Sequence, residues 1–448
     1  MLRGATFRSG ATARGAVAVG LAALALATSS GAASAQTIGQ QVRSADLATL
    51  RQIDVPSAWS LSKGSGVTVA VLDTGVGRSA PDLAGQVTAG PDFAAGANPP
   101  GYVPPHLHGT YIGSIIAGHG SGPGNSEGMI GVAPQAEILS VRVILDDQEP
   151  GFAVYNENAS YDDAIANGIK YAVAHGAGVI NMSLGGPGAT RSLRQAVANA
   201  IAHNVVVIAA AGNDATRRRH FTPYSYPASF TGVISVAAVG ASGKRAFFSD
   251  QNSSVVVSAP GLSVVGAGPG GSYLIADGTS PASAFVAGVA ALIRSRYPHL
   301  SPVQVMQAIV TSTRRRPASG YNPGVGFGEV DAAAALSAAG RLAATSAQPA
   351  GLAATAHFGG GPGGAIVVIH RDRRLIVTLA AISVAALVAF VILVVLLVAA
   401  LRRRRAQPPR SAAPPPAPPP PMPPPTGPPP PWPTDPPWPT APGQPVGP

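Results

Sequence analysis

Short apolar runs rich in β-branched residues alternate along the chain with longer stretches of helical periodicity. The runs have the length and composition of buried strands and lie at 66–72, 138–143, 178–183, 205–210 and 233–239. The helical stretches between and after them lie at 108–118, 161–175, 190–202, 280–296 and 301–312. Buried strands joined by helices are typical of parallel sheets. The sequence therefore predicts an α/β fold with a mostly parallel, doubly wound sheet and helices on both faces.

Three short segments carry the residue types that nucleophilic acyl transfer requires. Asp73 ends the apolar run 67–72, His108 opens a His-Gly-Thr segment, and Ser280 ends a Gly-Thr-Ser segment. An aspartate can orient an imidazole, the imidazole can take a proton, and the hydroxyl can attack a carbonyl. Strand ends and helix starts can meet at one rim of a parallel sheet. We therefore predict that Asp73, His108 and Ser280 form a catalytic triad.

The chain order Asp, His, Ser and the segments around these residues resemble the subtilases, the subtilisin-like serine proteases. The matching blocks are Val69-Ala70-Val71-Leu72-Asp73-Thr74-Gly75, His108-Gly109-Thr110, Gly131-Val132-Ala133-Pro134, Val179-Ile180-Asn181-Met182-Ser183-Leu184-Gly185-Gly186, Ala210-Ala211-Gly212-Asn213, and Gly278-Thr279-Ser280 with Val286-Ala287-Gly288. The resemblance implies a subtilisin-like fold over residues 54–337 and a serine endopeptidase.

The resemblance also assigns roles around the triad. It implies that the Asn213 side chain donates a hydrogen bond to the oxyanion, and that the Ser280 amide assists at a helix start. It places the peptide substrate against Ser183, Leu184, Gly185 and Gly212, where the substrate adds a strand to an exposed edge. His106 lacks the following Gly-Thr and is left out of the site.

Four residues depart from the pattern that subtilases commonly show. Pro281 follows the nucleophile directly, where a proline at the first helical position need not block catalysis because it removes an amide that would be unpaired anyway. Tyr111 stands after His-Gly-Thr, and Ala284 and Phe285 stand after the serine block. We expect these three to alter specificity or rate, with Tyr111 narrowing the cleft.

The first 35 residues have the layout of a cleaved secretory signal peptide. Arg3, Arg8 and Arg14 precede an apolar stretch at 16–27, and Ala33-Ser34-Ala35 provides a small-residue cleavage site. Residues 36–53 then form a short N-terminal extension. The sequence therefore predicts that the catalytic part is exported from the cytoplasm.

Residues 375–401 contain no charged side chain and are expected to form a single transmembrane helix. At about 1.5 Å per residue such a helix reaches roughly 40 Å, enough to cross a bilayer with tilt. A Gly-rich linker at 338–374 precedes it, and a Pro-rich tail at 402–448 follows it. With an exported N-terminus, we expect a type I protein of the cell membrane whose Pro-rich tail is cytoplasmic.

The formal net charge of +10 does not indicate a nucleic-acid partner. Most of the excess lies in the signal peptide and beside the predicted span, and residues 36–370 hold 19 basic and 18 acidic side chains. The chain has no cysteine, which excludes a thiol nucleophile, disulfides and thiolate metal sites. No cofactor or metal is predicted. The expected partners are a peptide or protein substrate and the lipid bilayer.

The short extension, the single C-terminal span and the small cytoplasmic end resemble the mycosins, the membrane-anchored subtilases of type VII secretion systems. This resemblance implies a protease of exported proteins that works near the membrane, with type VII secretion components as partners. Two alternatives stay open: a structural subunit of a secretion complex with incidental catalysis, and a free-standing surface quality-control protease.

Overall fold

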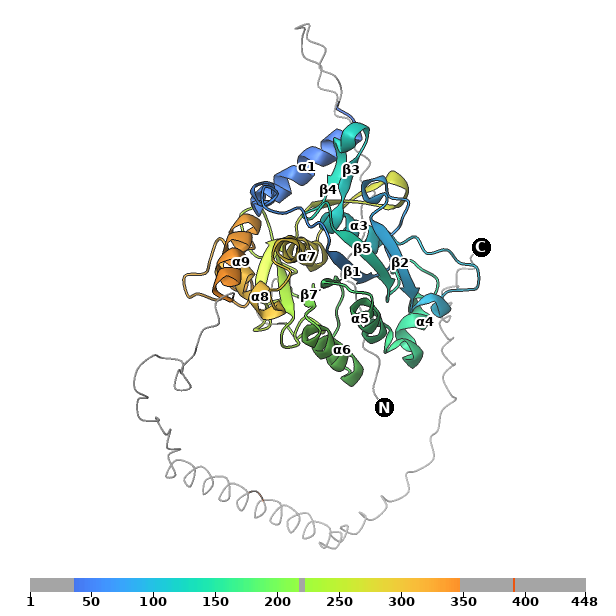
Figure 1. Cartoon of the computed structure of the whole chain (residues 1–448). Coiled ribbons are helices and arrows are strands. Elements are labelled where there is room, and N and C mark those ends of the chain that lie inside the picture. The colour runs from blue at the N-terminus through green and yellow to red at the C-terminus, as the bar shows by residue number, and fades with distance from the viewer. Residues whose placement is uncertain (1–35, 217–221, 347–389, 391–448) are drawn as a thin grey trace, which may run out of the picture. The chain divides into compact units, whose positions relative to one another are not determined.

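A seven-stranded parallel sheet forms the centre of the described fold (Figure 1). The computed structural model describes residues 36–216, 222–346 and 390. In spatial order the strands are β2 (Val87–Asp92), β5 (Glu137–Arg142), β1 (Thr68–Asp73), β6 (Val179–Met182), β7 (Val206–Ala210), β8 (Ile234–Val239) and β9 (Val257–Pro260). Every neighbouring pair is parallel. The predicted mostly parallel sheet is confirmed.

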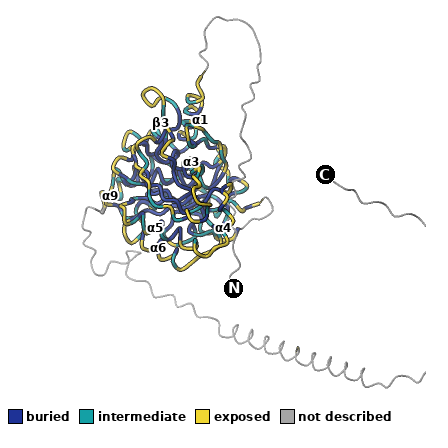
Figure 2. The backbone as a smooth tube through the Cα atoms, turned by 90° about the vertical axis from the view of Figure 1, so that its right-hand side faces the viewer, coloured by how far each residue is buried: buried dark blue, intermediate teal, exposed yellow. Residues whose placement is uncertain are grey.

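The sheet is buried on both faces because successive side chains of a strand point to opposite sides. In β1, Val69 and Val71 belong to a core with α3 (Leu107–Ala117) and α7 (Thr279–Arg296), whereas Ala70 and Leu72 belong to a core with α5 (Ala164–Ala174) and α6 (Arg191–Ala202). Figure 2 shows the buried backbone in the interior and the exposed segments outside. Helices therefore cover both faces, as predicted.

The strand order reverses beside β1. The chain places β2 and β5 on one side of β1, and β6 to β9 on the other. Connections therefore leave the carboxyl ends of β1 and β6 in opposite directions, which is where open parallel sheets bind their ligands. The predicted site residues lie at this edge of the sheet, beside the point where the strand order reverses.

Several further elements surround the sheet. They are α1 (Ile38–Gln52), α2 (Val55–Ala58), α4 (Phe152–Glu157), α8 (Pro302–Thr311) and α9 (Ala332–Ser346), the hairpins β3 (His119–Ser121) with β4 (Glu127–Ile130) and β10 (Val264–Ala267) with β11 (Tyr273–Ala276), and the short 3₁₀ turns Pro81–Leu83, Ala95–Ala97, Pro123–Asn125, Ala159–Tyr161 and Pro269–Gly271. Of the helices in this group, only α8 was among the predicted ones. The edge strand β2 was missed because its sequence holds glycine and proline and is half exposed.

The predicted N-terminal extension forms helix α1, which packs against β4. A capping box of Thr37 and Gln40 starts the helix. The Arg43 guanidinium donates to the backbone oxygens of Asn125, Glu127 and Gly128 at 3.1, 2.7 and 2.8 Å. One turn later, the buried Asp46 accepts the amide of Ile130 at 2.8 Å.

We expect Arg43→Ala to lower the free energy of unfolding by about 2–3 kcal/mol, because three backbone oxygens lose a charged donor. Burial raises the pKa of Asp46 to about 8, and the charge of Arg43 opposes that rise. Removal of the Arg43 charge therefore also disfavours the ionised form of Asp46. Urea unfolding of the protein measures the change. Arg51→Ala, on the exposed side of the same helix, is the control and should cost about 0.5 kcal/mol or less. Equal losses would contradict this role of Arg43.

Helix α9 continues to Ser346 and so crosses the boundary expected at residue 337. Within the described residues, none of the helices combines the length and apolarity needed to cross a bilayer. The predicted signal peptide, most of the predicted span at 375–401, and the Pro-rich tail lie outside the described residues.

Candidate active site

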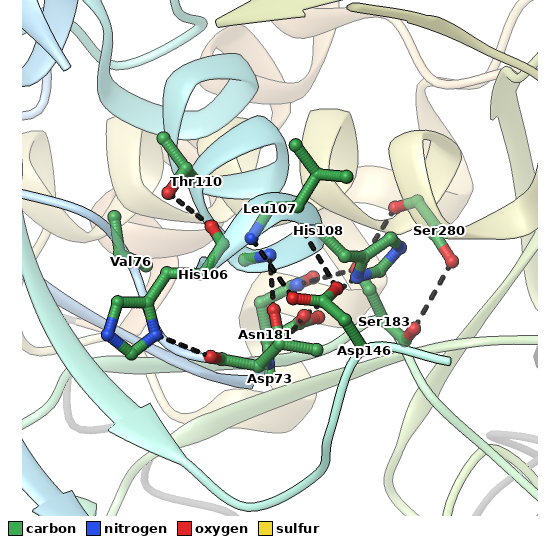
Figure 3. Close-up of polar contacts among 12 residues, drawn as sticks. Asp73, Val76, His106, Leu107, His108, Thr110, Asp146, Asn181, Ser183 and Ser280 are labelled. Atoms are coloured by element: carbon green, nitrogen blue, oxygen red, sulfur yellow. Dashed lines mark hydrogen bonds and ion pairs between the residues drawn. The ribbon is translucent and has the colours of Figure 1, made fainter. Parts of the chain in front are cut away.

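The predicted site residues lie at the carboxyl edge of adjacent strands of the sheet. Asp73 is the last residue of β1, Ser183 follows β6, and Asn213 follows β7 by three positions. His108 and Ser280 each occupy the second position of a helix, α3 and α7 respectively. In Figure 3 the His108 imidazole lies between Asp73 and Ser280.

Asp73 and His108 form a close pair. Nδ1 of His108 lies 2.7 Å from Oδ1 of Asp73, whose side chain is fully buried, while the histidine side chain is 26% exposed. The same carboxylate oxygen accepts the amide of Thr74 at 2.7 Å. A proton on Nδ1 that is donated to Asp73 leaves Nε2 as the acceptor on the other side of the ring. This ring can therefore accept a proton from a neighbouring hydroxyl.

The charge around His108 favours its protonated form. Burial lowers the pKa of His108, but the charge and hydrogen bond of Asp73, followed by the charges of Asp146 and Asp147, outweigh burial and raise that pKa above its usual 6.5. The pair can thus stabilise an imidazolium that forms during a reaction.

Ser280 is partly exposed at the start of α7 and is hydrogen-bonded to Ser183, which follows β6. Its hydroxyl donates to the Ser183 backbone oxygen at 3.2 Å, and the Ser183 hydroxyl donates to the Ser280 backbone oxygen at 3.1 Å. No hydrogen bond joins Ser280 to His108 within the described residues. Catalytic hydrogen bonds are often long or poorly aligned until substrate binds. The α7 start also supplies the positive end of a helix dipole at the hydroxyl.

Asn213 is held by a residue that precedes the candidate nucleophile. Its Oδ1 accepts both the backbone amide and the hydroxyl of Thr279, at 2.9 and 3.0 Å. This leaves the Nδ2 amide hydrogens of the partly exposed Asn213 as donors beside Ser280. An amide donor fixed next to a nucleophile is the arrangement that stabilises a developing oxyanion.

A family model that describes the subtilases matches residues 64–328, which is more than half of the chain. The match contains Asp73, His108, Ser183, Asn213 and Ser280. The chain belongs to the subtilase family. Together with the relatives described below, this membership makes the protein a serine endopeptidase of the subtilisin type.

Relatives of this subtilase include subtilisins and secretion-linked enzymes. Subtilisin DY of Bacillus licheniformis is 38% identical over 274 residues, which span 61% of this chain and 92% of that protein. The solved MycP3 protease from the type VII (ESX-3) secretion system is 30% identical with a TM-score of 0.53, over 64% of this chain and 87% of that one. MycP1, solved with its N-terminal propeptide removed, is 28% identical with a TM-score of 0.54, over 64% and 96%.

The predicted substrate segment of this subtilase offers free backbone groups. Gly186 pairs with Tyr226 on one side, but within the described residues no backbone hydrogen bond engages Leu184 or Gly185. Leu184 is 7% exposed and its side chain packs in the core, so we expect its backbone and not its side chain to face a substrate. A Cβ at Gly185 would lie 2.4 Å from the Ser225 hydroxyl, so a larger residue there requires the Ser225 side chain to move.

The expectation that Tyr111 narrows the cleft is wrong. Tyr111 is 2% exposed, its hydroxyl donates to the Val264 backbone oxygen at 3.0 Å, and its ring fills the space that a side chain at Gly266 would need. Ala284 and Phe285 are also buried. Tyr111, Ala284 and Phe285 therefore pack in the interior, and Tyr111 does so behind the site, with its ring centroid 6.5 Å from that of His108.

His106 and Asp146 lie beside the site in different roles. His106 bonds the Thr74 backbone oxygen through Nδ1 at 2.7 Å and makes no contact with Ser280 among the described bonds. Asp146, which sequence analysis missed, accepts the backbone amides of Leu107 and His108 at 3.1 and 3.2 Å. It therefore caps α3 from outside, since His106 at the N-cap position supplies no side-chain bond.

A buried polar network holds Asp146 in place. Its backbone amide donates to Glu149 at 2.9 Å, and Glu149 pairs with the buried Arg142 at 2.6 Å. Burial is the main cause that raises the pKa of Asp146, with Asp73 adding to the rise and His108 opposing it.

We expect Asp146→Asn to move the acid limb of the kcat/KM profile to lower pH. Catalysis needs neutral His108, so activity is lost as the pH falls through the raised pKa of that residue. The substitution removes one of the charges that raise this pKa and keeps an acceptor for one of the two helix amides. Peptide hydrolysis measured across pH tests this.

Glu137→Gln is the matched control for Asp146→Asn. It removes one negative charge from the exposed opposite end of β5 and should leave the acid limb in place. If the acid limb of the kcat/KM profile did not move in Asp146→Asn, the charge of Asp146 would not act on His108.

Proposed function

We propose that this subtilase is a membrane-anchored serine endopeptidase that cleaves exported proteins through Asp73, His108 and Ser280. The observation that carries the proposal is the 2.7 Å contact between Asp73 and His108, formed at the sheet edge where Ser280 is partly exposed. The three side chains lie far apart in the sequence and have complementary proton-transfer roles.

The geometry supports a two-step acyl transfer. Ser280 Oγ attacks the peptide carbonyl carbon while Nε2 of His108 takes the hydroxyl proton, and Asp73 stabilises the imidazolium. His108 then gives that proton to the leaving amine, and an acyl-enzyme ester forms on Ser280. A water molecule attacks the ester with His108 again as base, which releases the acid and restores Ser280.

The negative charge on the carbonyl oxygen is met by two donors in this proposal. One is Nδ2 of Asn213 and the other is the backbone amide of Ser280 at the start of α7. The substrate backbone lies along Leu184 and Gly185, whose backbone groups have no backbone partners in the described residues. Gly212 borders this edge in the turn that carries Asn213.

We expect Asn213→Ala to lower kcat by about 10² to 10³-fold with little change in KM, because the donor acts on charge that develops in the transition state. The magnitude is that of the equivalent donor in subtilisin, a member of the same family. Asn213→Asp keeps an acceptor for Thr279 but loses the donor, so it should be at least as impaired. A nearly active Asn213→Asp would assign the residue to holding Thr279.

The location of the enzyme rests on the predicted signal peptide and on the predicted span at 375–401. We expect the full chain to stay in the membrane pellet after carbonate washing, with residues 54–337 digested by protease added to intact cells. Release of the protein by carbonate, or protection of this region in intact cells, would contradict the proposed anchoring.

The proposed association with type VII secretion draws support from the similarity to MycP1 and MycP3. A chromosomal Ser280→Ala copy should abolish cleavage of the exported substrate to the same extent as deletion of the gene. If secretion persisted with Ser280→Ala but stopped on deletion, a structural role in the secretion complex would be favoured. Gentle solubilisation should recover secretion components, and their absence would favour a free-standing surface protease.

A further inference from the structure

Asp250 is buried directly behind the turn that carries Asn213. It is 1% exposed and lies in the connection between β8 and β9. Its Oδ1 accepts the amide of Asp214 at 3.0 Å, and its own amide donates to the Gly212 backbone oxygen at 2.9 Å. Asp250 therefore bonds the main chain on both sides of Asn213.

Gly212 leaves room for this carboxylate. Its φ of +115° lies in the region that favours glycine, and a Cβ at this position would lie 2.1 Å from Oδ2 of Asp250. The Gly212 amide donates to the Thr279 hydroxyl at 3.2 Å. The glycine predicted to bind substrate thus lets the carboxylate approach the turn.

The described surroundings of Asp250 disfavour its ionised form. Burial and the nearby Asp214 raise the pKa of Asp250 to about 7, against the hydrogen bonds of Asp214, Ala215 and Thr222. Arg245 is close enough to interact electrostatically, but its guanidinium bonds backbone oxygens of the segment 246–249. Within the described residues no cation is hydrogen-bonded to this carboxyl group, and its burial costs stability. What the carboxyl group provides is hydrogen bonding to the backbone of the Asn213 turn.

We propose that Asp250 is a positioning residue that fixes the Asn213 turn, so that Nδ2 of Asn213 points to the oxyanion. Thr279 holds the Asn213 side chain and Asp250 holds its main chain. The inference rests on the proposed role of Asn213 as oxyanion donor. Loosening one side of this arrangement misplaces a donor whose effect depends on its geometry.

A kinetic double-mutant cycle tests the proposal. Asp250→Ala should lower kcat by about tenfold to a hundredfold, with KM changed by less than about threefold, because the donor acts in the transition state. In the Asn213→Ala background the same substitution should lower kcat by less than about twofold, since no donor remains to be positioned. Asp250→Asn keeps an acceptor of the same shape and should recover most of the activity.

Asp82→Ala is the matched control. Asp82 is a fully buried carboxyl that accepts the Met129 amide at 2.9 Å away from the site, and its removal should affect stability more than kcat. Should Asp250→Ala fail to fold, the cycle runs with Asp250→Leu, a side chain of similar shape that cannot accept a hydrogen bond, and with a peptide boronate inhibitor. The inhibition constant should then rise in parallel with kcat loss and be insensitive to Asp250 in the Asn213→Ala background.

The outcomes separate this inference from the proposed function. Equal kcat losses from Asp250→Ala with and without Asn213, or a loss confined to KM, would overturn the positioning role while Ser280→Ala stays inactive. Retained hydrolysis in Ser280→Ala would instead overturn the proposed function itself.

Discussion

Ser280→Ala is expected to lower kcat for peptide hydrolysis by about 10⁶-fold, roughly 8 kcal/mol of transition-state stabilisation. The magnitude is carried over from subtilisin, where removal of the nucleophile has this effect. The substitution deletes one hydroxyl, whose bond in the described structure is to the Ser183 backbone oxygen, so the fold should persist. Stopped assays with a chromogenic peptide and a thermal unfolding curve measure the two quantities.

Ser283→Ala is the control for the loss of a hydroxyl in α7. Ser283 is fully buried one turn further along, and its hydroxyl donates to the Ser280 backbone oxygen at 2.9 Å. We expect it to lower kcat by about tenfold at most. A Ser280→Ala variant that kept more than about one hundredth of the activity would show that another residue is the nucleophile.

Asp73→Asn is expected to lower kcat by about 10⁴-fold, because an amide in place of the carboxylate disturbs the tautomer of His108 and no longer stabilises its imidazolium. The size of the side chain is kept, but Oδ1 of Asp73 accepts both His108 Nδ1 and the Thr74 amide. A variant amide that turns its NH₂ group to His108 therefore also loses the bond to Thr74. The readout is kcat/KM for a peptide near neutral pH, together with the unfolding temperature.

Asp82→Asn controls for loss of a buried carboxylate away from the site. Asp82 is as fully buried as Asp73 but bonds Met129, and no described bond joins it to His108. It should retain most of the kcat. If both asparagine variants lost activity equally, the effect of Asp73→Asn would come from a general disturbance of the fold.

The sequence predicted the elements whose pattern is repetitive and whose residues form contiguous motifs. The strands that became β1, β5, β6, β7 and β8 are short β-branched runs buried on both faces, so length and composition identify them. Asp73, His108 and Ser280 stand in distinctive blocks, and the fold brings them to one edge. Their roles stay a proposal that the variants above test.

The residues that support the site could not be predicted from the sequence, for a different reason. Asp146, Asp250 and Thr279 act through hydrogen bonds to backbone amides or to an amide side chain, at separations of 36 to 66 positions along the chain. An aspartate in a loop has many common uses, and no spacing rule connects it to a helix start so far away. Only the three-dimensional arrangement reveals these partners.

Tyr111 shows how a comparison of single positions can mislead. A large side chain in place of a small one beside His108 suggested a narrower cleft. The Tyr111 ring does lie near that of His108, but it is buried and its hydroxyl donates to β10. The ring then fills space that Gly266 leaves open, so the exchange is compensated inside the core. The predicted signal peptide, most of the span and the Pro-rich tail lie outside the described residues and stay predictions.

Labelling with a fluorophosphonate probe followed by peptide mapping tests the central claim most directly. The reagent reacts with a serine hydroxyl that a neighbouring base activates, and it reports the residue modified. We predict one phosphonylated peptide that carries the adduct on Ser280, and no labelling of Ser280→Ala or of heat-unfolded protein. An adduct on another residue, or equal labelling of wild type and Ser280→Ala, would contradict the assignment of Ser280 as the nucleophile.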